Sequence, residues 1–272
     1  MVNGFRPASL AEALSIRAEH PVTPYAGGTD LMVRQKPGQT YLFLDGVQEL
    51  KQITADGEFV RIGAAVTFTQ ALESELVPAF MKAAVSKIAA PAIRNAGTFG
   101  GNLGNGSAKA DSVLVEYAMD AKLRLISAGG ERILPVEDFY QGRKRLALRE
   151  DELIGEILLP RIAEEDWYYQ KVGGRNALAI SRVAFAGVLS LREGRIANLS
   201  AAFGAVADTV LRFRDLEAML LGKTPEEARA AKAAYLDACA GRLALTEGRV
   251  SAAYRKTVCM NLLRDFLESR GL

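Results

Sequence analysis

Two glycine-rich stretches define this chain: Pro24-Tyr25-Ala26-Gly27-Gly28-Thr29-Asp30-Leu31 and Thr98-Phe99-Gly100-Gly101-Asn102-Leu103-Gly104-Asn105-Gly106-Ser107. Paired glycines let a backbone approach a ligand closely and adopt positive φ. Successive N–H groups in such turns form concave anion sites, and a following helix N-terminus adds partial positive charge. Either turn alone could serve only chain reversal. Two of them in one compact domain predict two loops that clamp one large, phosphate-bearing ligand.

Length and composition restrict the class of protein. A chain of 272 residues is long enough for two domains, and its 49% hydrophobic and 24% charged residues are ordinary for a globular protein. The net charge of +2 gives no indication of a nucleic-acid partner. We find no apolar run long enough for a membrane span and no secretory signal at the N-terminus, so a cytoplasmic location is expected.

Cysteine and histidine are too few for several kinds of site. The only cysteines are Cys239 and Cys259, whereas an iron–sulfur cluster held by this chain would need about four thiolates. The single histidine, His20, precedes Pro21 and is expected in a surface loop. We therefore predict no metal site and no catalytic Ser–His or Cys–His pair.

The pattern of apolar residues predicts a mixed α and β chain. Capping boxes begin helices at Ser9 and Thr67, and Thr224 with Pro225 begins a third. Gly129-Gly130 and Glu193-Gly194 indicate hairpins. Strands are expected at 22–25, 41–44, 59–62, 122–127, 131–134, 152–159, 167–172, 183–191 and 196–206. Further helices are expected at 78–88, 111–119, 211–221 and 251–267.

An acidic segment that begins at Pro160 indicates a domain boundary at 160–166. The expected domains are residues 1–160, with subdomains at about 1–55 and 56–160, and residues 167–272.

The glycine loops match neither common nucleotide motif. The sequence contains no G-x-x-x-x-G-K-[ST], which a P-loop requires, and no G-x-G-x-x-G follows its first strand. The short polar residues near the loops are Thr29, Asn102, Ser107 and Asp111. They can bond phosphate or ribose hydroxyls, although each could instead cap a local helix.

The ordered set of motifs resembles one family across nearly the whole chain. The segment 26–31, then Ile93-Arg94-Asn95-x-x-Thr98-Phe99-Gly100-Gly101-Asn102-Leu103 with Asp111, is similar to the FAD-binding (medium) subunit of the molybdenum hydroxylases. That family includes xanthine dehydrogenase and carbon monoxide dehydrogenase. Further matches are Asp120-Ala121-Lys122-Leu123, Asp151-Glu152-Leu153-Ile154, Tyr168-x-x-Lys171-x-x-x-Arg175 and Ser251-x-x-Tyr254-Arg255.

The resemblance implies an α+β fold. A two-subdomain FAD-binding domain of the vanillyl-alcohol-oxidase/PCMH type would be followed by a C-terminal domain of a small antiparallel sheet and three helices. It also implies a cofactor site and no catalytic acid or base. In that site residues 24–31 would wrap part of the FAD diphosphate, and residues 98–102 would supply backbone N–H groups from the other side. Asp111 would bond a ribityl or ribose hydroxyl, and Lys171 would approach the isoalloxazine edge. The expected cofactor-binding residues are Pro24, Tyr25, Ala26, Gly27, Gly28, Thr29, Asp30, Leu31, Thr98, Phe99, Gly100, Gly101, Asn102, Ser107, Asp111, Ile154 and Lys171.

The resemblance further implies an electron-transfer subunit. A large subunit with the molybdenum cofactor and a small subunit with [2Fe–2S] centres would be separate chains. Electrons would reach the FAD of this chain and leave to NAD, a quinone, flavodoxin or oxygen.

The chain departs from the family after the second glycine stretch. The usual Ser-Pro is Ser107-Ala108 here, Lys109 follows, and Ser112-Val113-Leu114 replaces the prolines that are common after the aspartate. These departures leave open a flavin-free assembly or scaffold subunit of a molybdoenzyme. A stand-alone flavin oxidoreductase is the other alternative. The absence of an extra Cys-rich loop argues against the relatives that reduce aromatic acyl-CoA thioesters.

Overall fold

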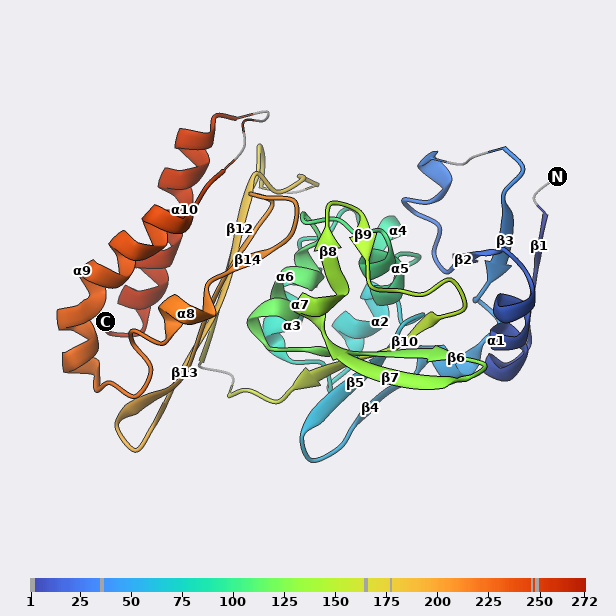
Figure 1. Ribbon diagram of the computed structural model, residues 1–272, viewed down its shortest axis with the longest axis horizontal. Helices are drawn as coiled ribbons and strands as arrows, with labels where there is room; N and C mark the ends of the chain where they lie inside the picture. The colour runs from blue at the N-terminus through green and yellow to red at the C-terminus, as the bar shows by residue number, and fades with distance from the viewer. Residues whose placement is uncertain (1–2, 35–36, 164–165, 177, 246, 248–249) are drawn as a thin grey trace. The chain divides into compact units, whose positions relative to one another are not determined.

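The computed structural model describes residues 3–34, 37–163, 166–176, 178–245, 247 and 250–272 (Figure 1). The chain forms two compact units. The first unit comprises Met1–Ser107 and Asp120–Arg161, and the second unit comprises Ala108–Met119 and Ile162–Leu272. The segment directly after the second glycine stretch therefore groups with the C-terminal part of the chain.

A small parallel sheet begins the first unit. Its strands lie in the order β1 (Asn3–Phe5), β3 (Thr40–Phe43) and β2 (Thr23–Tyr25). Parallel strands need a crossover, and helix α1 (Leu10–Glu19) connects β1 to β2. The first glycine stretch leaves the sheet at the end of β2 and leads into the 3-10 helix η1 (Met32–Arg34). Ligands of open α/β sheets commonly bind at this carboxyl end of the strands.

A larger, antiparallel sheet forms the rest of the first unit's β-structure. Its order is β4 (Ile53–Ala55), β5 (Phe59–Gly63), β10 (Leu153–Pro160), β6 (Lys122–Ser127) and β7 (Gly130–Pro135). The central strand β10 is buried along most of its length because it pairs on both sides. A bulge between Ile154 and Glu156 interrupts its pairing with β6. Bulges re-aim neighbouring side chains and often occur beside functional sites.

Short helices connect the strands of this unit. Thr67 begins α2 (Phe68–Glu73) with a complete capping box, as the sequence predicts, and Thr98 caps α5 (Phe99–Gly104). The remaining short elements are η2 (Gln48–Lys51), α3 (Ala79–Val85), α4 (Pro91–Arg94), α7 (Val136–Phe139) and the hairpin of β8 (Tyr140–Gly142) and β9 (Arg145–Leu146).

The second unit is built on a four-stranded antiparallel sheet. Its order is β11 (Trp167–Val172), β12 (Val183–Arg192), β13 (Arg195–Gly204) and β14 (Leu211–Arg212). Helix α6 (Asp111–Ala118) packs on β12 and β13, where Ser200 Oγ donates to the Ala118 carbonyl at 2.6 Å.

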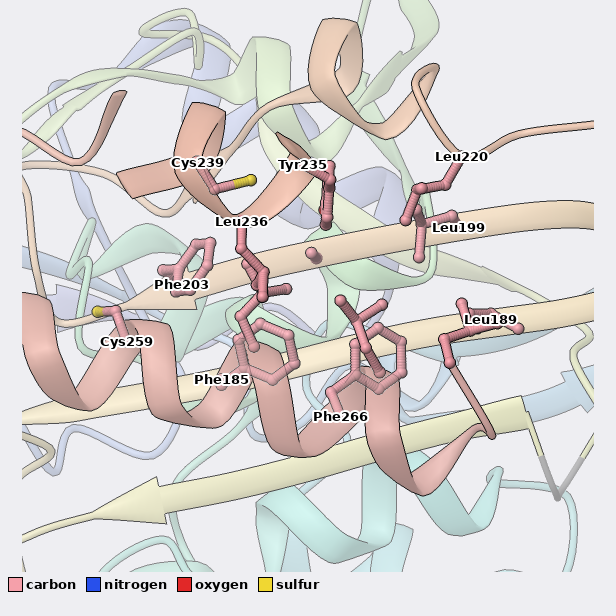
Figure 2. Close-up of a cluster of buried hydrophobic side chains, with 14 of the residues drawn as sticks. Phe185, Leu189, Leu199, Phe203, Leu220, Tyr235, Leu236, Cys239, Cys259 and Phe266 are labelled. Atoms are coloured by element: carbon pink, nitrogen blue, oxygen red, sulfur yellow. The ribbon is translucent and has the colours of Figure 1, made fainter. Parts of the chain in front are cut away.

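Helices α8 (Arg214–Glu217), α9 (Pro225–Arg242) and α10 (Ala252–Ser269) complete the second unit. Alternate residues of β12 and β13 pack with α9 and α10 in one apolar core, and Figure 2 shows Phe185, Phe203 and Phe266 meeting there. The rings of Phe185 and Phe203 lie 5.2 Å apart and those of Phe185 and Phe266 lie 5.5 Å apart, as expected for packed aromatic pairs. Both cysteines are buried in this core and are not disulfide-bonded.

Two predicted helices are shorter in the structure. The expected helix at 78–88 is helical only from Ala79 to Val85. The expected helix at 211–221 is wrong at its start, because Leu211 and Arg212 form strand β14 against β13. The cause is tertiary: these residues pair with β13, and Arg212 Nη1 donates to the Tyr117 carbonyl at 2.8 Å, which holds the segment at the sheet edge. The described helices include none that is both long and apolar enough to cross a membrane.

Candidate functional site

A cavity of about 590 Å³ lies in the first unit, within the usual range for a small-molecule site. Its walls come from the first glycine stretch, α5, β10 and the β8–β9 turn. The predicted site residues that line it are Pro24, Ala26, Gly27, Gly28, Thr29, Asp30, Leu31, Thr98, Gly100, Gly101, Asn102 and Ile154. The structure thus brings together both glycine stretches and Ile154, which lies at the β10 bulge.

The first glycine stretch offers unused backbone donors. The N–H groups of residues 26–31 donate to no acceptor within the described part of the chain. Gly28 has a φ of 67°, and a Cβ there would lie 2.3 Å from the Tyr25 hydroxyl. A Cβ on Gly27 would lie 1.7 Å from the Ala96 carbonyl oxygen, so only glycine fits where this loop meets the approach to α5. Consecutive unpaired N–H groups beside a cavity suit the oxygens of a diphosphate.

The N–H groups at the start of the second glycine stretch donate to acceptors within the chain. The Phe99 and Gly100 N–H groups donate to the carbonyls of Val66 and Ala64, at 3.2 and 2.8 Å. The Gly101 N–H donates to Thr98 Oγ1 at 3.0 Å, and the Asn102 N–H donates to the Thr98 carbonyl at 3.0 Å. These four N–H groups are therefore already hydrogen-bonded within the chain, and the expectation that residues 98–102 supply N–H groups to the ligand stays a prediction. The glycines of α5 also line the cavity, where a ligand can lie close to the backbone.

Three predicted residues of the first unit do not line the cavity. Tyr25 packs against Phe43 at 5.0 Å between ring centroids. Phe99 is fully buried against Phe68 at 5.3 Å, and Ser107 also lies outside the lining. Tyr25 and Phe99 thus support the two loops from behind.

About half of the residues that line the cavity were not predicted from the sequence. Gly104 and Asn105 are among them, although they belong to the second glycine stretch. Most of the others come from segments that carry no motif. The missed lining residues are Thr23, Gln39, Leu44, Ala64, Ala65, Phe68, Gly97, Gly104, Asn105, Lys144, Leu148 and Leu153.

The remaining predicted residues, Asp111 and Lys171, form a buried polar cluster in the second unit. Lys171 Nζ donates to Asp111 Oδ2 at 2.7 Å, and both side chains are less than a tenth exposed. Ser181 Oγ and the Tyr169 hydroxyl donate to Asp111 Oδ1 at 2.9 and 3.1 Å. Tyr169 and Ser181 carry no recognisable motif. Strand β11 pairs with β12, on which α6 packs, and so Tyr169 and Lys171 lie within reach of Asp111.

In this cluster the positive charge of Lys171 lies against the carboxylate of Asp111. Burial raises the pKa of Asp111, while Lys171, Ser181 and Tyr169 oppose that rise by stabilising the carboxylate. Burial and the neighbouring Asp111 also raise the pKa of Tyr169, so its hydroxyl stays protonated and donates. Three donors thus occupy three of the roughly four lone-pair positions of the Asp111 carboxylate.

No group of three or more His, Cys, Asp or Glu residues in the described ranges is arranged to hold a metal ion. The lining suits a dinucleotide, because backbone N–H groups match phosphates and a largely apolar wall with a few polar groups matches rings and ribose.

Comparison with known protein families covers both units. Residues 1–162 match the FAD binding domain in molybdopterin dehydrogenase, and residues 167–269 match the CO dehydrogenase flavoprotein C-terminal domain. The putative xanthine dehydrogenase FAD-binding subunit of Escherichia coli is 35% identical over 224 residues, which cover 78% of this chain and 76% of that protein. The nicotine 6-hydroxylase medium subunit of Paenarthrobacter nicotinovorans is 29% identical and covers 93% of this chain and 94% of its own length.

Solved structures show the same fold. A chain of the reconstituted CO dehydrogenase from Oligotropha carboxidovorans superposes with a TM-score of 0.89 at 26% identity, covering 99% of this chain and 97% of that one.

The fold and the cavity define an FAD-binding subunit of an oxidoreductase. More narrowly, the chain belongs to the family of FAD-binding subunits of the molybdenum hydroxylases. The resemblance, the cofactor and the α+β fold class that the sequence predicts are confirmed.

Proposed function

We propose that this chain is the electron-transfer subunit of a multi-subunit molybdenum hydroxylase. In this proposal electrons arrive from [2Fe–2S] centres on a small partner chain and leave to an acceptor such as NAD. A large partner chain would bind the molybdenum cofactor and the substrate. Support comes from relatives named as FAD subunits or medium chains, among them the nicotinate dehydrogenase FAD-subunit of Eubacterium barkeri.

The observation that carries the proposal is the row of N–H groups at residues 26–31, which line the cavity and have no acceptor among the described residues. These groups would bind the diphosphate, and the glycines of α5 would let the cofactor lie against the opposite wall. Ile154 at the β10 bulge would present backbone groups to a ring system. The roles that the resemblance implies for Asp111 and Lys171, which belong to the second unit, stay predictions.

The buried Lys171–Asp111 pair and the two buried cysteines suit a subunit that transfers electrons and has no catalytic nucleophile of its own. Bound FAD would supply the exchange between one-electron and two-electron transfer. Lys171 is paired with Asp111, so the pair presents a balanced charge. Burial raises the pKa of the Cys239 thiol to about 11 and that of the Cys259 thiol to about 12, so neither is a thiolate nucleophile at neutral pH. We place the complex in the cytoplasm as part of the same proposal.

The acceptor can be tested on the FAD-loaded chain alone. The flavin is reduced photochemically without oxygen and then mixed with NAD, a neutral quinone or oxidised flavodoxin, while flavin and NADH absorbance are followed. We expect reoxidation by NAD with one NADH formed per flavin. Reoxidation by quinone or flavodoxin only would contradict NAD as the acceptor.

The partners can be tested by co-expression with candidate large molybdenum-binding and small iron–sulfur chains from the same organism. We expect a stable three-chain complex in which substrate reduces the flavin. A complex that keeps molybdenum turnover with an artificial dye but never reduces the flavin would contradict the electron-transfer role.

A further inference from the structure

Three side chains connect distant segments of the cavity wall. Asn105 Nδ2 donates to Asp30 Oδ2 at 2.7 Å, which joins the end of α5 to the first glycine stretch. Lys144 Nζ donates to Asn105 Oδ1 at 2.7 Å and also to the Asn105 carbonyl oxygen, which joins α5 to the β8–β9 turn. Asp30, Asn105 and Lys144 all line the cavity.

The amide of Asn105 lies between the carboxylate of Asp30 and the ammonium group of Lys144. The amide of Asn105 directs its N–H group toward a carboxylate and its oxygen toward an ammonium group. The reversed amide would place oxygen against oxygen and nitrogen against nitrogen, so only one orientation is favourable. Hydrogen bonds with an ionised partner are roughly twice as strong as neutral ones. Lys144 is the one cation and Asp30 the one anion among the described lining residues. The Asp30–Asn105–Lys144 contacts therefore also balance the charge of the cavity wall.

The backbone conformation that places Lys144 beside Asn105 is energetically unfavourable. Lys144 has a φ of 59°, a left-handed conformation that residues other than glycine adopt at a penalty. It lies against Gly106, where a Cβ would be 3.2 Å from the Lys144 Cα. A glycine would adopt this turn conformation without the steric penalty. The contacts of the Lys144 side chain with Asn105 offset that conformational penalty.

We propose that Asn105 and Lys144 are positioning residues that, with Asp30, hold the first glycine stretch against α5 and slow the release of the bound dinucleotide. The inference rests on the proposed role of residues 26–31 in binding the FAD diphosphate. The loop already touches the chain at Gly27, beside Ala96. The contact at Asp30 fastens its other end, so the loop is held on both sides of its donor groups.

This arrangement acts mainly on dissociation. A dinucleotide bound between the loop and α5 leaves only when the loop moves away, and this requires the charge-assisted bonds to break. Entry occurs while the loop is open, so the association rate depends little on these bonds. The expected effect of removing the bridge is about a tenfold faster FAD release with a similar association rate.

The test measures FAD association and dissociation on the full chain by flavin fluorescence. The variants are Asn105→Ala, Lys144→Met, Lys144→Gly and the double variant Asn105→Ala/Lys144→Gly. Lys144→Gly removes the ammonium group and relieves the backbone cost, so it keeps the test valid if Lys144→Met folds poorly. Matched controls are Lys51→Met and Gln52→Ala, because both side chains bond backbone carbonyls outside the cavity wall.

We expect each bridge variant to release FAD about tenfold faster, and the double variant to be no faster than either single one, because the residues act as one unit. Added salt should speed release from the wild-type chain but not from Lys144→Gly. Unchanged release rates in wild-type-like, folded variants would overturn the inference. A wild-type chain that binds no FAD would instead overturn the proposed function, and this inference with it.

Discussion

At the scale of single residues, the carboxylate of Asp111 is the acceptor of a buried polar cluster. Three donors hold it, and one of them is the ammonium group of Lys171. Buried ion pairs add little net stability, but removing one partner leaves a buried, uncompensated charge. Sequence reasoning named both residues and could not show that they neutralise each other.

Asp111→Asn should destabilise the second unit by about 3–5 kcal/mol, because Lys171 loses its counter-charge. The double variant Asp111→Asn/Lys171→Met should recover part of that loss, and Ser181→Ala should cost only about 1 kcal/mol. Urea denaturation followed by tryptophan fluorescence measures this, since the single tryptophan, Trp167, lies in β11 of the same unit. A single variant as stable as the wild type would contradict the buried ion pair.

Glu116 gives a second prediction at this scale. It is fully buried on α6, and neither carboxylate oxygen has a hydrogen-bond partner of good geometry in the described part of the chain. Burial raises its pKa to about 8, with Ser112 partly opposing the rise.

Because the folded pKa exceeds the unfolded one, the folded state binds the extra proton, and stability falls as pH rises toward 8. The fall should be about 1.4 kcal/mol per pH unit at most. Glu116→Gln, which is neutral throughout, should abolish this component, so its advantage over the wild type should grow from pH 6 to pH 8. Equal urea midpoints for the two proteins at every pH would contradict a buried, titrating Glu116.

At the scale of elements, α5 has to be both a helix and a cavity wall. Thr98 caps it, while its glycines keep side chains out of the cavity. Gly104 lines the cavity, and a Cβ there would meet no atom within 4 Å. The helix itself therefore does not require a glycine at this position, whereas an open cavity does.

Gly104→Leu should therefore leave the apo-protein as stable as the wild type, or more stable by up to about 1 kcal/mol, because leucine favours a helix. The side chain should occupy the cavity and weaken FAD binding by about tenfold or more. Isothermal titration of FAD and thermal unfolding of the apo-protein separate the two effects. Gly57→Leu is the control, because Gly57 also has open space around its Cβ position but lies outside the cavity wall. Equal FAD affinity in the two variants would remove Gly104 from the site.

At the scale of the whole molecule, binding of FAD to the folded chain must stabilise it by mass action. At a free concentration of 100 times Kd, the gain is about 2.7 kcal/mol, which corresponds to a rise in Tm of about 5 °C. Riboflavin, which lacks the diphosphate that residues 26–31 are proposed to bind, should give a much smaller rise at equal concentration. Equal shifts for both ligands, measured by calorimetry, would show that the diphosphate is not what the chain binds.

Much of the architecture could be predicted because its signals are local. The capping boxes at Thr67 and Thr224 and the hairpin at Glu193-Gly194 depend on neighbouring residues only, and the structure confirms them. Strand β14 and the shortened helix after it could not be predicted locally, because β14 pairs with β13 and Arg212 bonds to the distant Tyr117 carbonyl.

The sequence by itself determined the family, the cofactor and the first glycine stretch, because backbone geometry at paired glycines and the order of motifs are properties of the chain alone. Only the tertiary structure decided how the donors are used. The carbonyls of Ala64 and Val66, just after β5, occupy the N–H groups of Gly100 and Phe99, whereas those of residues 26–31 have no acceptor among the described residues. Tertiary contacts also joined Asn105 to Lys144 and Asp111 to Lys171, since hydrogen bonds between distant segments depend on which surfaces the fold brings together.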